Sequence, residues 1–259
     1  LAEAPRVDRI ERDAFQRRHR AVASEGGGEG DDVLRFVSVG RPLPGNEVRL
    51  VDAKGRPAGD RVEAEIQFRG PSATAGYYRN PEATAELRTA DGWVKTGDRG
   101  YLAEGDLYIT GRLKDVIIKA GRNLHPPEVE AAAAEVDGVR KGCVAAFGVK
   151  SEVTGSEDLV VVAETRLEDP EARRRLASLI KRRVAAAVKV SPDAVELVPP
   201  RTVPKTPSGK LRRAETRERY LRGALVPRQR PLALELLGDD QCGIGEQGSR
   251  NSHSLLLSS

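Results

Sequence analysis

The stretch YITGRLKD, residues 108–115, separates two regions of different sequence pattern. Before it, residues 47–52, 65–69 and 106–110 alternate between apolar and polar side chains, and turn residues separate these segments. Alternation with a period of two predicts strands that bury one face. We therefore expect a β-rich region over residues 1–112, although its first residues are polar and helical in character.

Two local signals refine this first region. Asn80-Pro81-Glu82 has the pattern of a helix start, with a capping side chain, a proline in the first turn and an acid near the positive end of the dipole. Trp93, the single tryptophan, is most simply a core residue.

The region after residue 115 mixes helices with strands. Val129, Ala132 and Ala133 share one face of a helix that Pro127 can open. Two more helices are predicted, one from the stripe Leu176, Leu179, Ile180 and Val184 and one from the charged residues 213–222. Short strands are expected at residues 116–118, 142–149, 158–165 and 195–198. This mixture predicts an α+β domain over residues 113–225, followed by a disordered tail over residues 226–259.

Composition limits the classes of function. The chain has 259 residues, of which 39% are hydrophobic and 32% charged, as in soluble globular proteins. We expect a cytoplasmic protein, because there is no signal segment and no apolar run near the roughly 20 residues that span a bilayer. Aromatic residues are only 4% and do not interleave with basic ones, which argues against nucleic-acid binding. Because the chain begins with leucine and has no methionine, we expect an internal fragment.

Cysteines and charges suggest no separate chemistry. Cys143 lies in an apolar run and is expected to be a buried thiol, while Cys242 lies in the Gly/Ser-rich tail. Between residues 170 and 225 there are 15 Lys/Arg and 5 Asp/Glu. Such an excess attracts phosphates or acidic partners. A solvated helix surface is the alternative for most of these arginines.

Four segments carry the candidate functional residues. In PKTPSGK, residues 204–210, Lys210 stands at the end of a Pro/Gly loop and can reach an anion, although the P-loop spacing is absent and a plain basic turn is the alternative. In Thr96-Gly97-Asp98, the carboxylate can accept hydrogen bonds from two hydroxyls, or it is a turn aspartate. Gly111-Arg112-Leu113-Lys114-Asp115 lies on the domain boundary, where a surface ion pair is the alternative. His125 could line a loop near a site, although a catalytic histidine needs a positioned partner, which the sequence does not show.

Taken in order, these segments resemble the adenylate-forming superfamily: acyl-CoA synthetases, fatty acyl-AMP ligases, luciferases and the adenylation domains of peptide synthetases. The resemblance rests on GYYRNPEAT (76–84), Thr96-Gly97-Asp98, YITGRLKD (108–115) and PKTPSGK (204–210), and it spans roughly residues 36–222. Within the superfamily, FVSVGRPLPG (36–45) and GRNLHP (121–126) are most similar to fatty acyl-AMP ligases and long-chain acyl-CoA synthetases.

The resemblance implies a fold and a set of roles. Residues 1–112 would be the β-rich end of the large AMP-binding domain, and residues 113–225 the small, mobile C-terminal domain. The resemblance implies that Asp98 binds the ribose with Arg112 assisting, and that Lys114 is a hinge. It implies that Lys210 bridges the substrate carboxylate and the α-phosphate. It also implies an Mg²⁺-associated acid at Glu3 and a thiol-acceptor loop at Gly121, Arg122 and Asn123.

The resemblance also implies a reaction. A small-molecule carboxylic acid, fatty or other, would react with ATP and Mg²⁺ to give acyl-AMP and pyrophosphate. The acyl group would then pass to coenzyme A or to the phosphopantetheine of an acyl carrier protein. Because the family's phosphate-binding loop is absent from this sequence, the fragment alone is not expected to adenylate. The alternatives are a peptide-synthetase adenylation domain and a non-catalytic remnant that docks a carrier protein. Ala64 and Ala120 stand where relatives often have glycine.

Overall fold

The computed structural model describes residues 4–24, 30–151 and 156–225. Glu3 and the tail expected over residues 226–259 lie outside these residues. The described residues all belong to one compact unit. No helix in this part of the chain is long and apolar enough to cross a membrane.

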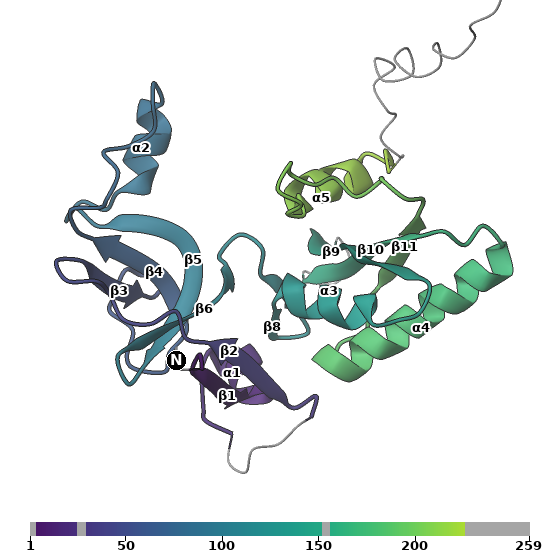
Figure 1. Cartoon of the computed structure of the whole chain (residues 1–259), viewed down its shortest axis with the longest axis horizontal. Coiled ribbons are helices and arrows are strands. Elements are labelled where there is room, and N and C mark those ends of the chain that lie inside the picture. Colours follow the sequence, from purple (N-terminus) through teal and green to yellow (C-terminus); the bar gives the residue numbers. More distant parts are fainter. Residues whose placement is uncertain (1–3, 25–29, 152–155, 226–259) are drawn as a thin grey trace, which may run out of the picture. The chain divides into compact units, whose positions relative to one another are not determined.

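The first region is organised around an antiparallel sheet of four strands in the order β3-β4-β5-β6 (Figure 1). The strands are β3 (Glu47–Val51), β4 (Ala64–Arg69), β5 (Val94–Ala103) and β6 (Asp106–Arg112). One face buries Leu50, Ala64 and Ile66, so the alternating pattern predicts β3, β4 and β6 correctly. Both pairings of β5 contain an irregularity, between Glu65 and Gln67 and between Arg99 and Gly100.

A second, two-stranded sheet begins the described chain. It pairs β1 (Val7–Glu11) with β2 (Val33–Val37), and α1 (Arg12–Arg18) follows β1 directly. The N-terminal residues therefore begin as a strand, and only the next seven residues are helical. Phe15 of α1 packs with Tyr101 and Tyr108, whose rings stack at 5.0 Å between centroids. This aromatic cluster joins α1 to strands β5 and β6.

Helix α2 (Pro81–Leu87) begins as its sequence predicts. The side chain of Asn80 accepts a hydrogen bond of 2.9 Å from the amide of Ala83, which satisfies one of the free donors of the first turn. Nearby, Trp93 is buried between two guanidinium groups, with Cζ of Arg49 at 4.4 Å and Cζ of Arg69 at 4.7 Å from its ring centroid. The expectation that Trp93 is a core residue is confirmed.

The second region contains a hairpin, a three-stranded sheet and three helices. The hairpin is β7 (Ile117–Lys119) and β8 (Arg122–Leu124). The sheet has the order β11-β10-β9, in which β9 and β10 are antiparallel while β10 and β11 are parallel. The remaining elements are β9 (Val139–Lys150), β10 (Glu157–Thr165), β11 (Ala194–Val198), α3 (Pro126–Ala134), α4 (Pro170–Val188) and α5 (Arg213–Leu221).

Helices cover both faces of this sheet. Val144, Ala146, Leu159 and Val161 face α3 and α4, whereas Ala145, Phe147, Val160 and Val162 face Tyr220 of α5 and its flanking segments. Every residue of these strand segments is buried, which explains why the segments are continuous apolar runs in the sequence. The predicted stripe of α4 is wrong at one position: Leu179 is 42% exposed, and the buried face continues through Ala187 and Val188 instead. Cys143 is a buried free thiol, as expected.

Candidate active site

Asp98 and Arg112 lie opposite each other on the neighbouring strands β5 and β6. Nε of Arg112 is 3.3 Å from Oδ1 of Asp98, and both side chains reach solvent, that of Arg112 with 72% exposure. A carboxylate beside a guanidinium presents an acceptor and several donors to the same ligand. The pair can therefore bind a neighbouring diol from both sides.

The residues before Asp98 fix its position. Thr96 Oγ1 donates a hydrogen bond of 2.8 Å to the carbonyl of Ile66 on β4 and accepts one of 2.9 Å from the amide of Asp98. Gly97 has φ +71°, a conformation that favours glycine because a side chain there is strained. Threonine thus anchors the segment, glycine bends it, and Asp98 projects from a strand. The alternative of a turn aspartate is wrong, because the structure places Asp98 inside β5.

The stretch after β6 is tied to the same segment. The amide of Leu113 donates to the carbonyl of Gly97 at 2.8 Å, and the amide of Asp115 donates to the carbonyl of Arg112 at 3.1 Å. Lys114 lies in the resulting turn, with an exposed side chain. A rotation at Lys114 would therefore start immediately beside the Asp98–Arg112 pair.

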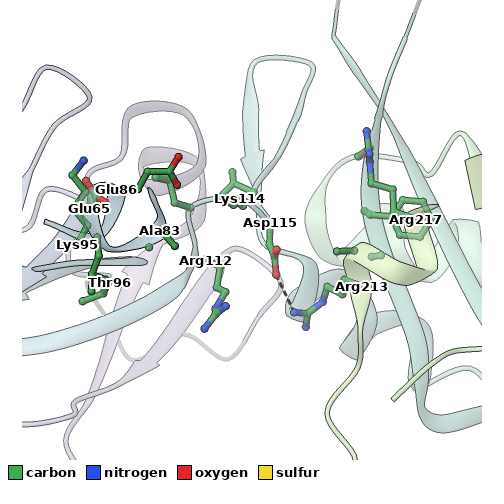
Figure 2. A pocket seen from close by; sticks show the side chains of 18 of the residues that line it. Glu65, Ala83, Glu86, Lys95, Thr96, Arg112, Lys114, Asp115, Arg213 and Arg217 are labelled. Atoms are coloured by element: carbon green, nitrogen blue, oxygen red, sulfur yellow. Dashed lines mark hydrogen bonds and ion pairs between the residues drawn. The ribbon is translucent and has the colours of Figure 1, made fainter. Parts of the chain in front are cut away.

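A groove of about 1090 Å³ runs along Gly97 and residues 112–115, while Asp98 itself does not line it. In Figure 2, Lys95, Thr96, Arg112 and Lys114 line one part of it, while residues from the second region, among them Arg213 and Arg217, line the other. Arg213 is held by Asp115 at 3.2 Å, and Arg217 donates to the carbonyl of Gly148. In the described part of the chain, Lys95 and Lys114 have no ion-pair partner, so their charges are available to an anionic ligand.

Lys210 lies in a tight loop between β11 and α5. Its amide donates to Oγ1 of Thr206 at 3.0 Å, its carbonyl accepts from the amide of Thr206 at 2.8 Å, and Gly209 has φ +84°. The side chain is exposed and makes no hydrogen bond or ion pair with any described residue. Lys210 does not line the groove, so the structure does not bring it together there with Arg112 and Lys114.

Gly121, Arg122 and Asn123 lie in the β7–β8 hairpin, and the side chains of Arg122 and Asn123 contact α1. Ala120 and Gly121 form the turn, with φ +50° and +68°. Arg122 pairs with Asp13 at 2.9 Å, and Asn123 donates to the carbonyl of Gln16 at 2.9 Å. These side chains are engaged with the first region in this arrangement.

The sequence reasoning missed a buried carboxylate next to the site. Glu63 accepts hydrogen bonds from Thr110 at 2.5 Å and lies 3.0 Å from Arg99. Burial alone would raise the pKa of Glu63, but the hydrogen bond with His19 and the nearby positive charges lower it below its ordinary value. The signal in the sequence is a glutamate at position 63, just before the alternating strand that begins at Ala64, yet nothing there marks it as buried.

His125 is packed rather than open to solvent. It is 5% exposed, and its ring lies against that of Phe15 with 5.7 Å between centroids. Burial lowers the pKa of His125, and the carboxylate of Glu63 only partly offsets this effect. His125 therefore packs inside the structure and does not line the groove.

Comparison with known proteins points to one class of enzyme. No protein-family model matches the sequence. A Mycobacterium tuberculosis protein that its name describes as a ligase is 38% identical over 211 residues, covering 81% of this chain and 38% of that protein. A long-chain-fatty-acid–AMP ligase of Mycobacterium marinum is 34% identical over 236 residues, covering 83% of this chain and 38% of the ligase.

A solved structure agrees with these relatives. A chain from a study of fatty acyl-adenylate ligases of E. coli and L. pneumophila matches with a TM-score of 0.74 and 33% identity, over 85% of this chain and 38% of that one. The relatives and structural neighbours of this chain are adenylate-forming ligases.

The match to adenylate-forming ligases is partial in length. The chain spans 34–38% of the curated relatives that it matches. It is mixed helix and sheet, as the resemblance implies, and it matches adenylate-forming domains in fold.

Proposed function

We propose that this chain is the C-terminal portion of an ATP-dependent acid ligase that forms an acyl-adenylate and passes the acyl group to a thiol. The observation that carries the proposal is the pair Asp98–Arg112, whose arginine lines a groove that Lys114 also lines. In the proposal, residues 1–112 are the end of the large domain, and residues 113–225 are the small domain that moves about Lys114.

The residues present fit the nucleoside part of ATP. The Asp98 carboxylate would accept hydrogen bonds from the ribose hydroxyls, and Arg112 would donate to them. For Mg²⁺, the described residues contain no group of three His, Cys, Asp or Glu side chains that could hold an ion. Glu3 remains a proposed Mg²⁺-associated acid outside the described residues, and no step is assigned to it.

Lys210 would act on the bond-forming step. A carboxylate oxygen of the acid bonds to the α-phosphorus of ATP, and the bond from that phosphorus to pyrophosphate breaks. Both reactants are anionic, so their approach is repulsive unless a cation lies between them. The exposed Lys210 ammonium would supply this charge once a rotation at Lys114 has carried its loop to the nucleotide. Preorganised charges of this kind contribute on the order of 3–4 kcal/mol.

The acyl acceptor would be coenzyme A or the phosphopantetheine of an acyl carrier protein. Gly121, Arg122 and Asn123 are the proposed acceptor loop. Because Arg122 and Asn123 contact α1 in this structure, the proposal requires the hairpin to separate from α1 before a thiol can pass. The acid itself is proposed only as a small-molecule carboxylic acid, fatty or other.

Docking of an acidic carrier protein without catalysis is the competing proposal. It rests on the excess of basic residues between 170 and 225. In the structure many of these charges are already paired within the chain, as in Arg174–Glu171, Arg183–Glu135 and Arg219–Glu215. This internal pairing reduces the charge that a partner would meet, and it favours the ligase proposal.

Nucleotide binding by the chain itself tests the proposal. We expect Asp98→Ala to weaken the binding of AMP, measured by isothermal titration calorimetry, by roughly 30- to 140-fold, since a hydrogen bond to a charged group contributes about 2–3 kcal/mol. Asp60→Ala, at an exposed aspartate outside the groove, is the matched control and should bind as the parent does. Equal affinity of the parent and Asp98→Ala would remove Asp98 from the nucleotide site.

A further inference from the structure

A buried cluster of polar side chains surrounds the carboxylate of Glu63. Oε1 lies 2.5 Å from Thr110 Oγ1 and 3.5 Å from His125 Nε2. Oε2 lies 2.8 Å from His19 Nδ1 and 3.0 Å from the guanidinium of Arg99. Asn123 Nδ2 completes the cluster at 3.2 Å from His19 Nε2. We call these residues the Glu63 cluster: His19, Glu63, Arg99, Thr110, Asn123 and His125.

The Glu63 cluster joins the two regions of the chain. His19, Glu63, Arg99 and Thr110 precede the turn at Lys114, whereas Asn123 and His125 follow it. Ile117 and Leu124, in the same hairpin as Asn123, are part of the apolar core that includes α3, α4 and β10. The cluster therefore connects this core to strands β5 and β6, which carry Asp98 and Arg112.

The other contacts between these regions are mostly polar. Arg12 contacts Glu128, and the further pairs are Arg122–Asp13 at 2.9 Å and Lys189–Asp32 at 3.1 Å. Interfaces of this polar kind resemble those between partners that associate transiently. An apolar interface would cost more free energy to separate, because separation would expose its apolar surface to water.

The cluster is also incompletely satisfied. Neither ring nitrogen of the buried His125 has a hydrogen-bond partner among the described residues, and the same is true of Nε of Arg99. Buried polar atoms without partners cost about 1–3 kcal/mol each. This cost opposes docking, so the contacts that cross between the two regions must outweigh it. Asn123 contacts Gln16 and His19, Glu63 holds His19 in place through its Nδ1, and His125 approaches the carboxylate of Glu63.

We propose that Glu63 is a latch that holds the region after Lys114 against strands β5 and β6, and that acidification releases it through protonation of His125. Release separates His125 and Asn123 from the other members of the Glu63 cluster and frees the β7–β8 hairpin from α1. The groups that face His125 are Glu63, Arg99 of β5, Thr110 of β6, and His19 and Phe15 of the α1 segment.

The direction of the pH effect follows from burial. His125 has a pKa below its ordinary value of 6.5, so the docked state favours the neutral ring. Below that pH the free hairpin binds a proton more readily than the docked one, and docking weakens as the pH falls. Glu63, with its pKa lowered as well, stays ionised over this range and does not trigger release.

Hydrogen exchange of the full chain tests the latch without any nucleotide, so the result does not depend on the proposed function. At pH 7.5, we expect Glu63→Gln to exchange at least tenfold faster than the parent in residues 15–19 and 117–124. Residues 144–147 and 159–163 of the core should remain protected. Glu168→Gln, at an exposed carboxylate, is the control and should match the parent. The parent should exchange faster in the same residues at pH 5.5, by at most about tenfold for one histidine with an undocked pKa of 6.5, after correction for intrinsic rates.

A second variant separates the latch from general stability. His125→Phe keeps a ring beside Phe15 but cannot be protonated, so its hairpin should exchange alike at pH 7.5 and 5.5 after the same correction. The latch is contradicted if Glu63→Gln exchanges in the hairpin as the parent does, or if it loses protection throughout the core. It is equally contradicted if the acid response persists in His125→Phe.

Discussion

At the scale of single residues, each residue of Thr96-Gly97-Asp98 contributes to the candidate site in a different way. Thr96 anchors the segment to β4 through its hydroxyl, Gly97 takes a positive φ, and Asp98 receives its position from both. The sequence identifies the motif, but it cannot show that Asp98 lies opposite Arg112. That pairing depends on the irregular register between β5 and β6.

Ala120 offers a residue-scale test of local strain. It is exposed, with φ +50° in the turn of the β7–β8 hairpin, where an L side chain costs roughly 1–2 kcal/mol. We expect Ala120→Gly to stabilise the chain by about 0.5–1 kcal/mol in urea denaturation, because the entropy of glycine offsets part of the relief.

The control is the same substitution at an exposed helical alanine. Ala131→Gly in α3 should destabilise the chain by about 1 kcal/mol, since glycine is a poor helix former. Two changes of the same sign would contradict the assignment of strain to Ala120.

At the scale of elements, one arginine fixes the loop that carries Lys210. Arg213, the first residue of α5, contacts both carboxylate oxygens of Glu130 in α3, at 2.6 and 2.8 Å. The hydrogen bond with Glu130 raises the pKa of Arg213, and Asp115 contributes as well. Because Arg213 lies three residues after Lys210, this clamp fixes the end of the loop.

Removal of the clamp should be costly. We expect Arg213→Ala to lower the free energy of unfolding by about 3 kcal/mol, because Glu130 would be left buried without its partner. Arg222→Ala, which removes a largely exposed pair with Glu218, should change it by under about 0.5 kcal/mol. Urea denaturation measures both. Similar losses of unfolding free energy for the two variants would show that the Glu130–Arg213 clamp stabilises the chain no more than an exposed ion pair does.

The sequence predicts best the elements that have a regular alternation of apolar and polar residues or a clear capping signal. The alternation in β3, β4 and β6 and the Asn80 cap of α2 are examples, and both are confirmed. The sequence does not predict strands β1, β5 and β8. Arg122–Leu124 is too short to show a period, and Gly97 and Gly100 interrupt the pattern of β5. Leu179 was placed on the wrong face because the stripe of α4 drifts toward Ala187 along a helix of 19 residues.

At the scale of the whole molecule, the two regions meet through charged and polar side chains that no single segment reveals. Glu63, His19 and His125 are more than 40 residues apart in sequence, so only the tertiary fold brings them together. The roles of Asp98, Arg112, Lys114 and Lys210 stay predictions, because they concern a nucleotide and a rotation.

Stability of the whole chain should fall as the solution is acidified from about pH 7 to pH 5. The pKa of His125 in the folded chain is below 6.5. The unfolded chain therefore binds a proton more readily in this pH range, and this lowers the free energy of unfolding. Urea denaturation at pH 7.5 and 5.5 measures the difference, and His125→Phe should show a smaller one. Stability that stays constant or rises on acidification would contradict the burial argument.

The central claim is that Lys210 reaches a nucleotide that Asp98 and Arg112 hold. ATP–pyrophosphate exchange by the complete enzyme that we propose tests it most directly, with Lys210→Ala compared to the parent. We predict a loss of about 10²- to 10³-fold in the exchange rate with nucleotide affinity retained, since the charge acts on the transition state. An exchange rate equal to that of the parent would contradict the account.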